Sequence, residues 1–265
     1  MFGLQRWQVE NTVKLIDEGN TIPFIARYRK EAHGTLDDQV LRELSEKLEY
    51  LRNLDKRREE ISISITAQEK MTPEIEAALE KASTLAEIED IYRPFRPKRR
   101  TRASIAKEKG LEPLADAIFA QTADSASPAE LAADYIDAEK GVETVEDAIN
   151  GAMDIIAENI SDDADIRRRL RSLFTVAGVL QSRAADSEKE SVYTMYYEYD
   201  EPVNKIAGHR VLAVNRGENE GFLKVGIDVD RIKALNIINA NVLSDNGSAC
   251  TDTVRDAAAD AYDRL

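Results

Sequence analysis

Apolar residues recur at helical spacing along most of the chain, and short polar or glycine-containing stretches separate the periodic segments. Residues 4–18 and 73–82 have apolar positions three and four residues apart, the spacing that lines one face of an α-helix. Thr35, with an acidic residue three places on, predicts the start of a helix that continues without glycine or proline to about residue 69. Its apolar residues change register after Leu51. We therefore expect one long helix, about 35–69, that changes the face it buries.

Residues 102–120 are typical of two short helices joined at Gly110. Ala106 and Gly110 match part of the helix-turn-helix pattern, in which a small residue lets the helices approach and glycine makes the turn. That pattern also has an apolar residue six positions after the glycine, where this chain has Asp116. A groove-reading unit and an ordinary αα-hairpin are therefore both open.

The hydrophobic period changes beyond residue 176. Segments 176–184 and 221–229 are expected to form strands, whereas 209–216 and 251–265 have helical spacing. Four tyrosines between residues 193 and 199 fit packing of a small core better than stacking of nucleobases. The predicted fold is mainly α: an elongated multi-helix scaffold with a helix-turn-helix unit and a small antiparallel β element near the C-terminal third. We expect a helical part (1–175), a small mixed α/β part (176–230), and a linker with a truncated helix (231–265).

Charge is distributed unevenly along the sequence. The 265 residues include 36 lysines and arginines against 50 acidic residues, a formal net charge of −14. Residues 93–109 nevertheless have eight basic side chains against one acid, whereas residues 121–165 have thirteen acids against Lys140 alone. A polyanion is repelled by nucleic acid, so any such binding requires a local basic patch. A second basic run, Arg167–Arg171, is expected to pair with neighbouring carboxylates on a solvated face, with nucleic-acid contact as the alternative.

Motifs for several kinds of chemistry are missing from the sequence. The chain has two histidines and one cysteine, Cys250, and it lacks a phosphate-binding loop, a dinucleotide fingerprint, a nucleophile elbow and a zinc-protease motif. We therefore expect no catalytic residues, no cofactor and no metal site, and hence no enzyme. No apolar run approaches the roughly 20 residues that span a bilayer, so no membrane partner is expected. The single cysteine and the absence of a signal peptide favour a cytoplasmic location.

Three stretches resemble one family, the bacterial transcription accessory protein Tex, in its N-terminal region. They are WQVENTVKLIDEGNTIPFIARYRKEAHGTLDD (7–38), IYRPFRPKRRTRASIAKEKGLEPLAD (91–116) and HRVLAVNRGENEG (209–221). The resemblance implies a multidomain, mostly helical scaffold in transcription and RNA handling. It also implies an RNase H-like domain, helix-hairpin-helix modules and a C-terminal OB-fold RNA-binding domain outside these residues. The last helix has no cap, so we expect the chain to continue.

Two hypotheses follow for function. In the first, a non-enzymatic Tex-like scaffold fragment makes weak, sequence-nonspecific contacts with RNA or DNA phosphates, and the transcription machinery is a further candidate partner. In the alternative, the chain is a structural or protein-interaction module that docks the other Tex domains or the transcription machinery. The arginines then pair with its own carboxylates, and only the OB fold binds nucleic acid. The candidate phosphate-contacting residues are Arg93, Arg96, Lys98, Arg99, Arg100, Arg102 and Lys107.

Overall fold

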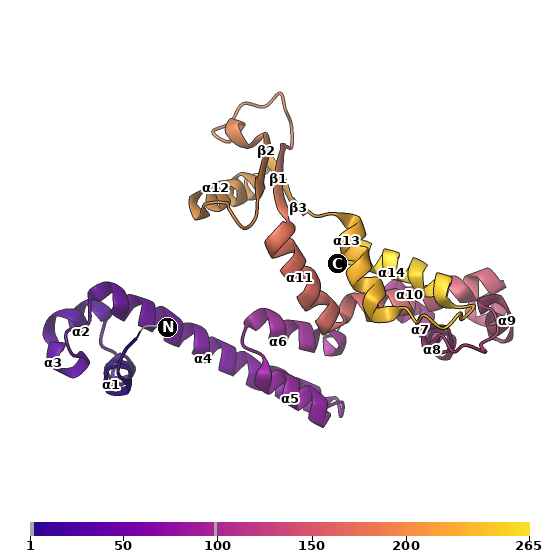
Figure 1. The fold of residues 1–265 in the computed structure, drawn as a ribbon, viewed down its shortest axis with the longest axis horizontal. Helices are drawn as coiled ribbons and strands as arrows, with labels where there is room; N and C mark the ends of the chain where they lie inside the picture. Colours follow the sequence, from indigo (N-terminus) through magenta and orange to yellow (C-terminus); the bar gives the residue numbers. More distant parts are fainter. Residues whose placement is uncertain (1–2, 98–99) are drawn as a thin grey trace. The chain divides into compact units, whose positions relative to one another are not determined.

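The structure is a computed structural model that describes residues 3–97 and 100–265. Those residues form a mainly helical protein with one small antiparallel sheet, which confirms the predicted fold class (Figure 1). None of the helices in the described residues is long and apolar enough to cross a membrane. The chain divides into two compact units, one ending at Tyr92 and one beginning at Arg93. Periodicity gives no sign of this boundary, because helical patterns lie on both sides of it.

The first unit is built along one long helix. Helices α1 to α3 pack at one end of α4, and α5 and α6 pack against its other end (Figure 1). The hydroxyl of Thr72 caps α5 by accepting a hydrogen bond from the backbone N–H of Ile75. The helices are α1 (Arg6–Asp17), α2 (Ile22–Tyr28), α3 (Lys30–His33), α4 (Asp38–Ala67), α5 (Pro73–Lys81) and α6 (Leu85–Tyr92).

Helix α4 has 30 residues and buries two different faces. Leu41 and Leu44 are buried near its start, whereas Leu54, Ile61 and Ile65 are buried further along. At 100° per residue the two sets point about 110° apart, so the helix serves two small cores on different sides. The predicted change of buried face is confirmed.

The predicted cap of this helix, Thr35, is wrong. Asp37 caps α4, because its side chain accepts a hydrogen bond from the N–H of Gln39. Gly34 and Thr35 both have left-handed φ values, +66° and +58°. The chain is still turning at these two residues, whereas Asp37 has the extended conformation of an N-cap.

The second unit packs around α10. This helix contacts α7, α8, α9 and α14, and its buried face combines small and branched residues, among them Ala148, Ala152 and Ile155. Helix α14 lies in the segment 251–265 expected to be helical, whereas part of the stretch expected as a linker forms α13, whose Ala234 and Ile238 lie in the same core. The elements here are η1 (Arg93–Phe95), α7 (Arg102–Glu108), α8 (Glu112–Ala120), α9 (Pro128–Ala132), η2 (Ala133–Tyr135), η3 (Ala138–Lys140), α10 (Val145–Asp162), α11 (Ala164–Ala177), α13 (Arg231–Val242) and α14 (Thr251–Arg264).

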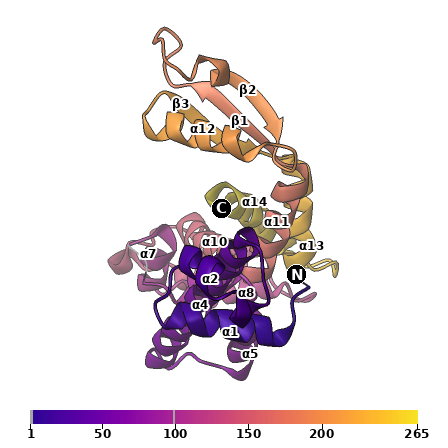
Figure 2. The ribbon, with the colours of Figure 1, turned by 90° about the vertical axis from the view of Figure 1, so that its left-hand side faces the viewer.

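A small antiparallel sheet lies between α11 and α13 in the sequence. Its strands are β1 (Val179–Ala184), β2 (Glu198–Pro202) and β3 (Leu223–Asp228), in the order β2-β1-β3, and α12 (Gly208–Asn219) packs on it (Figure 2). Tyr193 and Tyr196, in and beside η4 (Thr194–Tyr196), are buried with Leu180 and Val214 in a separate core. Packing of these tyrosines, rather than base stacking, is therefore confirmed.

Candidate nucleic-acid interface

The basic segment 93–109 comprises η1, the following loop and α7. Thr101 begins α7 with a capping box: its backbone N–H donates to the hydroxyl of Ser104, whose own N–H donates to the hydroxyl of Thr101. Gly110 ends the helix at φ +83°, the left-handed conformation that favours glycine. The N–H of Leu111 then donates to the carbonyl of Ala106, and α8 follows at once. These local signals fix the position of each basic side chain of α7.

Arg93 neutralises a buried carboxylate at the end of α10. Its Nε donates to Oδ1 of Asp162 over 2.9 Å, and the side chain of Asp162 is only 8 % exposed. A buried carboxylate without a partner is strongly destabilising. This guanidinium therefore already has a structural role.

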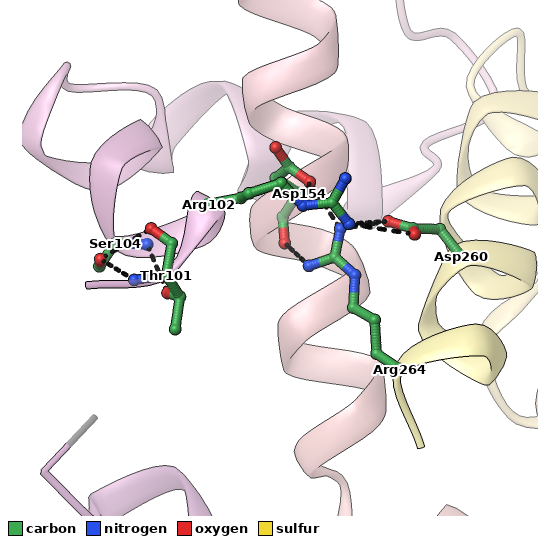
Figure 3. Close-up of polar contacts among 6 residues, drawn as sticks. All are labelled: Thr101, Arg102, Ser104, Asp154, Asp260 and Arg264. Atoms are coloured by element: carbon green, nitrogen blue, oxygen red, sulfur yellow. Dashed lines mark hydrogen bonds and ion pairs between the residues drawn. The ribbon is translucent and has the colours of Figure 1, made fainter. Parts of the chain in front are cut away.

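Arg102 belongs to a four-residue ion-pair network (Figure 3). Its Nε lies 3.3 Å from Oδ1 of Asp154, and its Nη2 lies 3.3 Å from Oδ1 of Asp260. Nη2 of Arg264 contacts the same two carboxylates, at 2.5 Å from Oδ1 of Asp154. Two guanidinium groups and two carboxylates leave no net charge in this cluster, which connects α7, α10 and α14.

Burial and ion pairing act in opposite directions on Arg264. Its side chain is 20 % exposed, and burial by itself lowers the pKa of the guanidinium. Hydrogen bonds to Asp260 and Asp154 outweigh that effect, so the pKa is raised overall. Arg264 thus stays charged beside the two aspartates that Arg102 also contacts.

The other predicted contact residues differ in how they are held. Nζ of Lys107 lies 2.7 Å from Oε1 of Glu112. Arg100 is 72 % exposed and is 3.6 Å from Glu108, a weak surface pair. Arg96 is exposed and forms no ion pair with any described residue. The two remaining predicted residues, Lys98 and Arg99, lie outside the described residues.

Helices α7 and α8 are joined at Gly110 as predicted, but α8 lacks the charge of a groove-reading helix. Leu114 and Ile118 face the core, whereas Glu112 and Asp116 are exposed, and the sequence of α8 has no lysine or arginine. Phosphates would be repelled by those two carboxylates. The arrangement favours the ordinary αα-hairpin.

The second basic run pairs with acids as expected. Arg169 lies 2.5 Å from Asp165, and Arg168 pairs with the same carboxylate. Hydrogen bonds from Arg168 and then from Arg169 lower the pKa of Asp165, although burial opposes them. Arg167 donates to the carbonyl of Ser161 over 3.1 Å.

A shallow depression between α7 and α10 has a volume of about 220 Å³. Arg102 and Lys109 line it together with Asp147 and Asp154, so the charges of its wall balance. Lys109 also donates to the carbonyl of Gly141 over 2.7 Å. In residues 3–97 and 100–265, no three histidine, cysteine or acidic side chains are grouped to hold a metal ion. The depression therefore offers neither a cationic anion site nor a metal site.

Comparison with known proteins identifies the family. Residues 1–66 match the model of the Tex-like protein N-terminal domain, and residues 123–261, more than half of the chain, match the Tex central region-like model. The chain belongs to the Tex family.

The chain is similar to proteins from bacteria and from humans. Protein tex of Bordetella pertussis is 44 % identical over 86 % of this chain, and the transcriptional accessory protein Tex of Neisseria gonorrhoeae is 39 % identical over 83 %. The human S1 RNA-binding domain-containing protein 1 is 31 % identical over 85 %. The chain spans 29 % of each bacterial Tex protein and 23 % of the human protein.

Sequence reasoning missed the acidic partners of the basic segment. Asp154 is one of thirteen acids in its region, and Asp260 lies 158 residues from Arg102. The opposite charge of the two segments indicates that pairing is favourable, but it does not indicate which acid meets which arginine.

Proposed function

We propose that this chain is a non-enzymatic scaffold of a Tex-type transcription accessory protein, in which the basic segment 93–109 holds helices together. The observation that carries the proposal is the contact of Arg102 with Asp154 and Asp260. If Arg102 turned to a phosphate, the two aspartates would share Arg264 alone, and the cluster would have a net negative charge. Removing one member of a partly buried ion-pair cluster is unfavourable.

The relatives support a setting for such a scaffold. One is named a transcriptional accessory protein, and another is named for an S1 RNA-binding domain. We infer that the whole protein acts in transcription and contacts RNA. In this proposal the present chain supplies the helical framework, and the principal RNA-binding surface lies elsewhere in the protein.

A second candidate function is weak phosphate contact by the outer part of the same segment. The exposure of Arg96 and Arg100 favours it, because neither guanidinium would have to leave a buried partner. Such contacts hold a nucleic-acid backbone without reading its sequence. They would add to the framework role rather than replace it.

One experiment separates the two roles. Labelled single- and double-stranded nucleic acid is titrated with the 265-residue chain at about 50 mM salt, where surface charge is weakly screened. Arg102→Ala should lower Tm by about 1–3 °C and leave affinity unchanged. Substituting both Arg96 and Arg100 by alanine should leave Tm unchanged and lower affinity if the second function operates.

The opposite pattern would contradict the scaffold proposal. Weaker binding by Arg102→Ala with an unchanged Tm would mean that its guanidinium serves nucleic acid and not the helices. If the Arg96 and Arg100 double variant binds as the unsubstituted chain does, the second function is excluded.

A further inference from the structure

Besides the basic segment 93–109, the chain has another cationic surface. It lies in the first unit, on α2 and the start of α3, and the proposed function does not use it. Ile25 is fully buried, and α2 packs on α4. Phe24, Arg27 and Tyr28 lie three and four residues apart, so they share one face of the helix, about 105° around the axis from Ile25. Because Ile25 is held in the core, Phe24, Arg27 and Tyr28 are exposed to solvent.

Two aromatic rings lie side by side on this face. Their centroids, in Phe24 and Tyr28, are 5.2 Å apart with an interplanar angle of 43°. Tyr28 is 63 % exposed and Phe24 is 38 % exposed. Aromatic side chains contribute strongly to interfaces, so two adjacent exposed rings are a candidate contact surface.

Three exposed cations flank the rings: Arg27, Arg29 and Lys30. The Cζ atom of Arg29 lies 5.5 Å from the centroid of the Phe24 ring. No described acid forms an ion pair with any of the three. The positive charge of this surface is therefore not neutralised by a neighbouring carboxylate.

Among the arginines of the first unit, Arg27 and Arg29 differ from the others. Every other arginine described between residues 3 and 92 pairs with an acid: Arg6 with Glu10, Arg42 with Asp38, Arg52 with Asp17, Arg57 with Glu60 and Glu89, and Arg58 with Asp55.

We propose that Phe24, Arg27, Tyr28, Arg29 and Lys30 form a binding surface for single-stranded nucleic acid. The rings stack on unpaired bases, and the three cations contact the phosphates on either side. Proteins that bind single strands combine these two groups, because every base has a face that can stack and every linkage has a charge. A duplex keeps its base faces stacked, so it offers the surface only its phosphates.

The size of the surface argues against a membrane. Helix α2 has seven residues, and its buried Ile25 points to the core. A helix that lies on a bilayer needs a broad apolar face, whereas this one has two rings amid cations. The three cations complement an anionic ligand. The two rings favour an anion that also has flat, accessible faces, as the bases of a single strand do.

The test measures fluorescence anisotropy of a labelled 12-nucleotide oligouridine RNA with the 265-residue chain. Tyr28→Ala should weaken binding about fivefold or more, the loss expected when one stacked base is removed. Three phosphate contacts predict a slope near −2 for the logarithm of affinity against that of salt concentration, about −0.7 per phosphate. Replacing Arg27, Arg29 and Lys30 by glutamate should abolish binding. Oligodeoxythymidine of equal length should bind within a few-fold of the RNA, because both share these groups.

A charge-matched variant is the control. Replacing Lys56, Lys70 and Lys81 by glutamate makes the same change of net charge at exposed positions of the same unit. This control should bind RNA nearly as the unsubstituted chain does. Circular dichroism and Tm verify that each variant is folded.

Several results would overturn the proposal. One is that the unsubstituted chain does not bind RNA, and another is that both triple variants lose equal affinity for RNA. A third is that Tyr28→Ala binds RNA with unchanged affinity. A fourth is that oligoglutamate displaces the labelled RNA as effectively as unlabelled RNA does. The last result would mean that an acidic protein segment fits the surface as well. Binding that depends on Arg96 and Arg100, and not on α2, would support the second proposed function while rejecting this one.

Discussion

Replacing Gly34 by alanine tests whether the turn after α3 requires a residue without a side chain. Gly34 has φ +66°, and a Cβ built there would lie 2.8 Å both from Nε2 of Gln8 and from Cη2 of Trp7. The left-handed conformation costs an L-residue about 1–2 kcal/mol. The new methyl would also displace the amide of Gln8, which donates to the carbonyl of His33 over 3.1 Å, a loss of about 1 kcal/mol. We expect the free energy of unfolding to fall by about 2–3 kcal/mol.

Urea denaturation followed by tryptophan fluorescence measures this change, because Trp7 is the only tryptophan in the chain. The variant should also shift the emission of the folded protein, since Trp7 must move. Gly19→Ala is the matched control: Gly19 has φ +84° but no atom within 4 Å of a built Cβ. It should lose only the conformational part, about 1–2 kcal/mol. Equal losses in both variants, with unchanged Trp7 emission, would refute the steric reasoning.

Two further predictions concern α10. Hydrogen bonding from Thr144 lowers the pKa of Asp147 below its ordinary 3.8, although burial opposes this shift. The carboxylate therefore stabilises α10 at neutral pH, and this stabilisation is lost as the pH falls. Asp147→Asn should therefore flatten the dependence of Tm on pH between about pH 5 and 3, and a profile parallel to that of the unsubstituted chain would contradict this. Gly151→Ala places a Cβ against the buried Leu111 side chain, so the urea midpoint should fall by the equivalent of about 1–3 kcal/mol. An unchanged midpoint would contradict this, because it would mean that Leu111 can move away from α10 without cost.

Helix starts could be predicted where the signal is local. Thr72 before a proline, and Ser127 and Thr144 with an acid three residues on, all cap helices in the structure. Thr35 has the same spacing but lies in a left-handed turn after α3. A cap motif therefore identifies a helix start only if the preceding chain can reach it in an extended conformation.

Two elements could not be predicted because tertiary contacts decide them. Strand β2 reads EYDEP, which lacks an apolar alternation, and it forms because β1 pairs with it. Helix α13 is rich in isoleucine and asparagine, and its Ala234 and Ile238 find their places only against the core around α10. Propensity is a weak guide where packing supplies most of the stability.

The uneven distribution of charge is visible in the sequence, but the ion pairs that result from it are not. Arg93 meets Asp162 across 69 residues, and Arg102 meets Asp260 across 158. Only the fold brings these segments together. The cations near Tyr28 show the converse: Glu31 lies four residues after Arg27, yet no ion pair forms between them, and the basic cluster stays exposed.

A double-mutant cycle between Arg102 and Asp154 tests most directly whether the basic segment serves the fold. Urea unfolding of Arg102→Ala, Asp154→Ala and the double variant gives the coupling energy. Arg102 is 64 % exposed and the two atoms are 3.3 Å apart, so solvent screening limits the pair to about 0.5–1 kcal/mol. We predict a coupling of that size that shrinks in about 1 M salt. Additive single effects, with no salt dependence, would contradict the account.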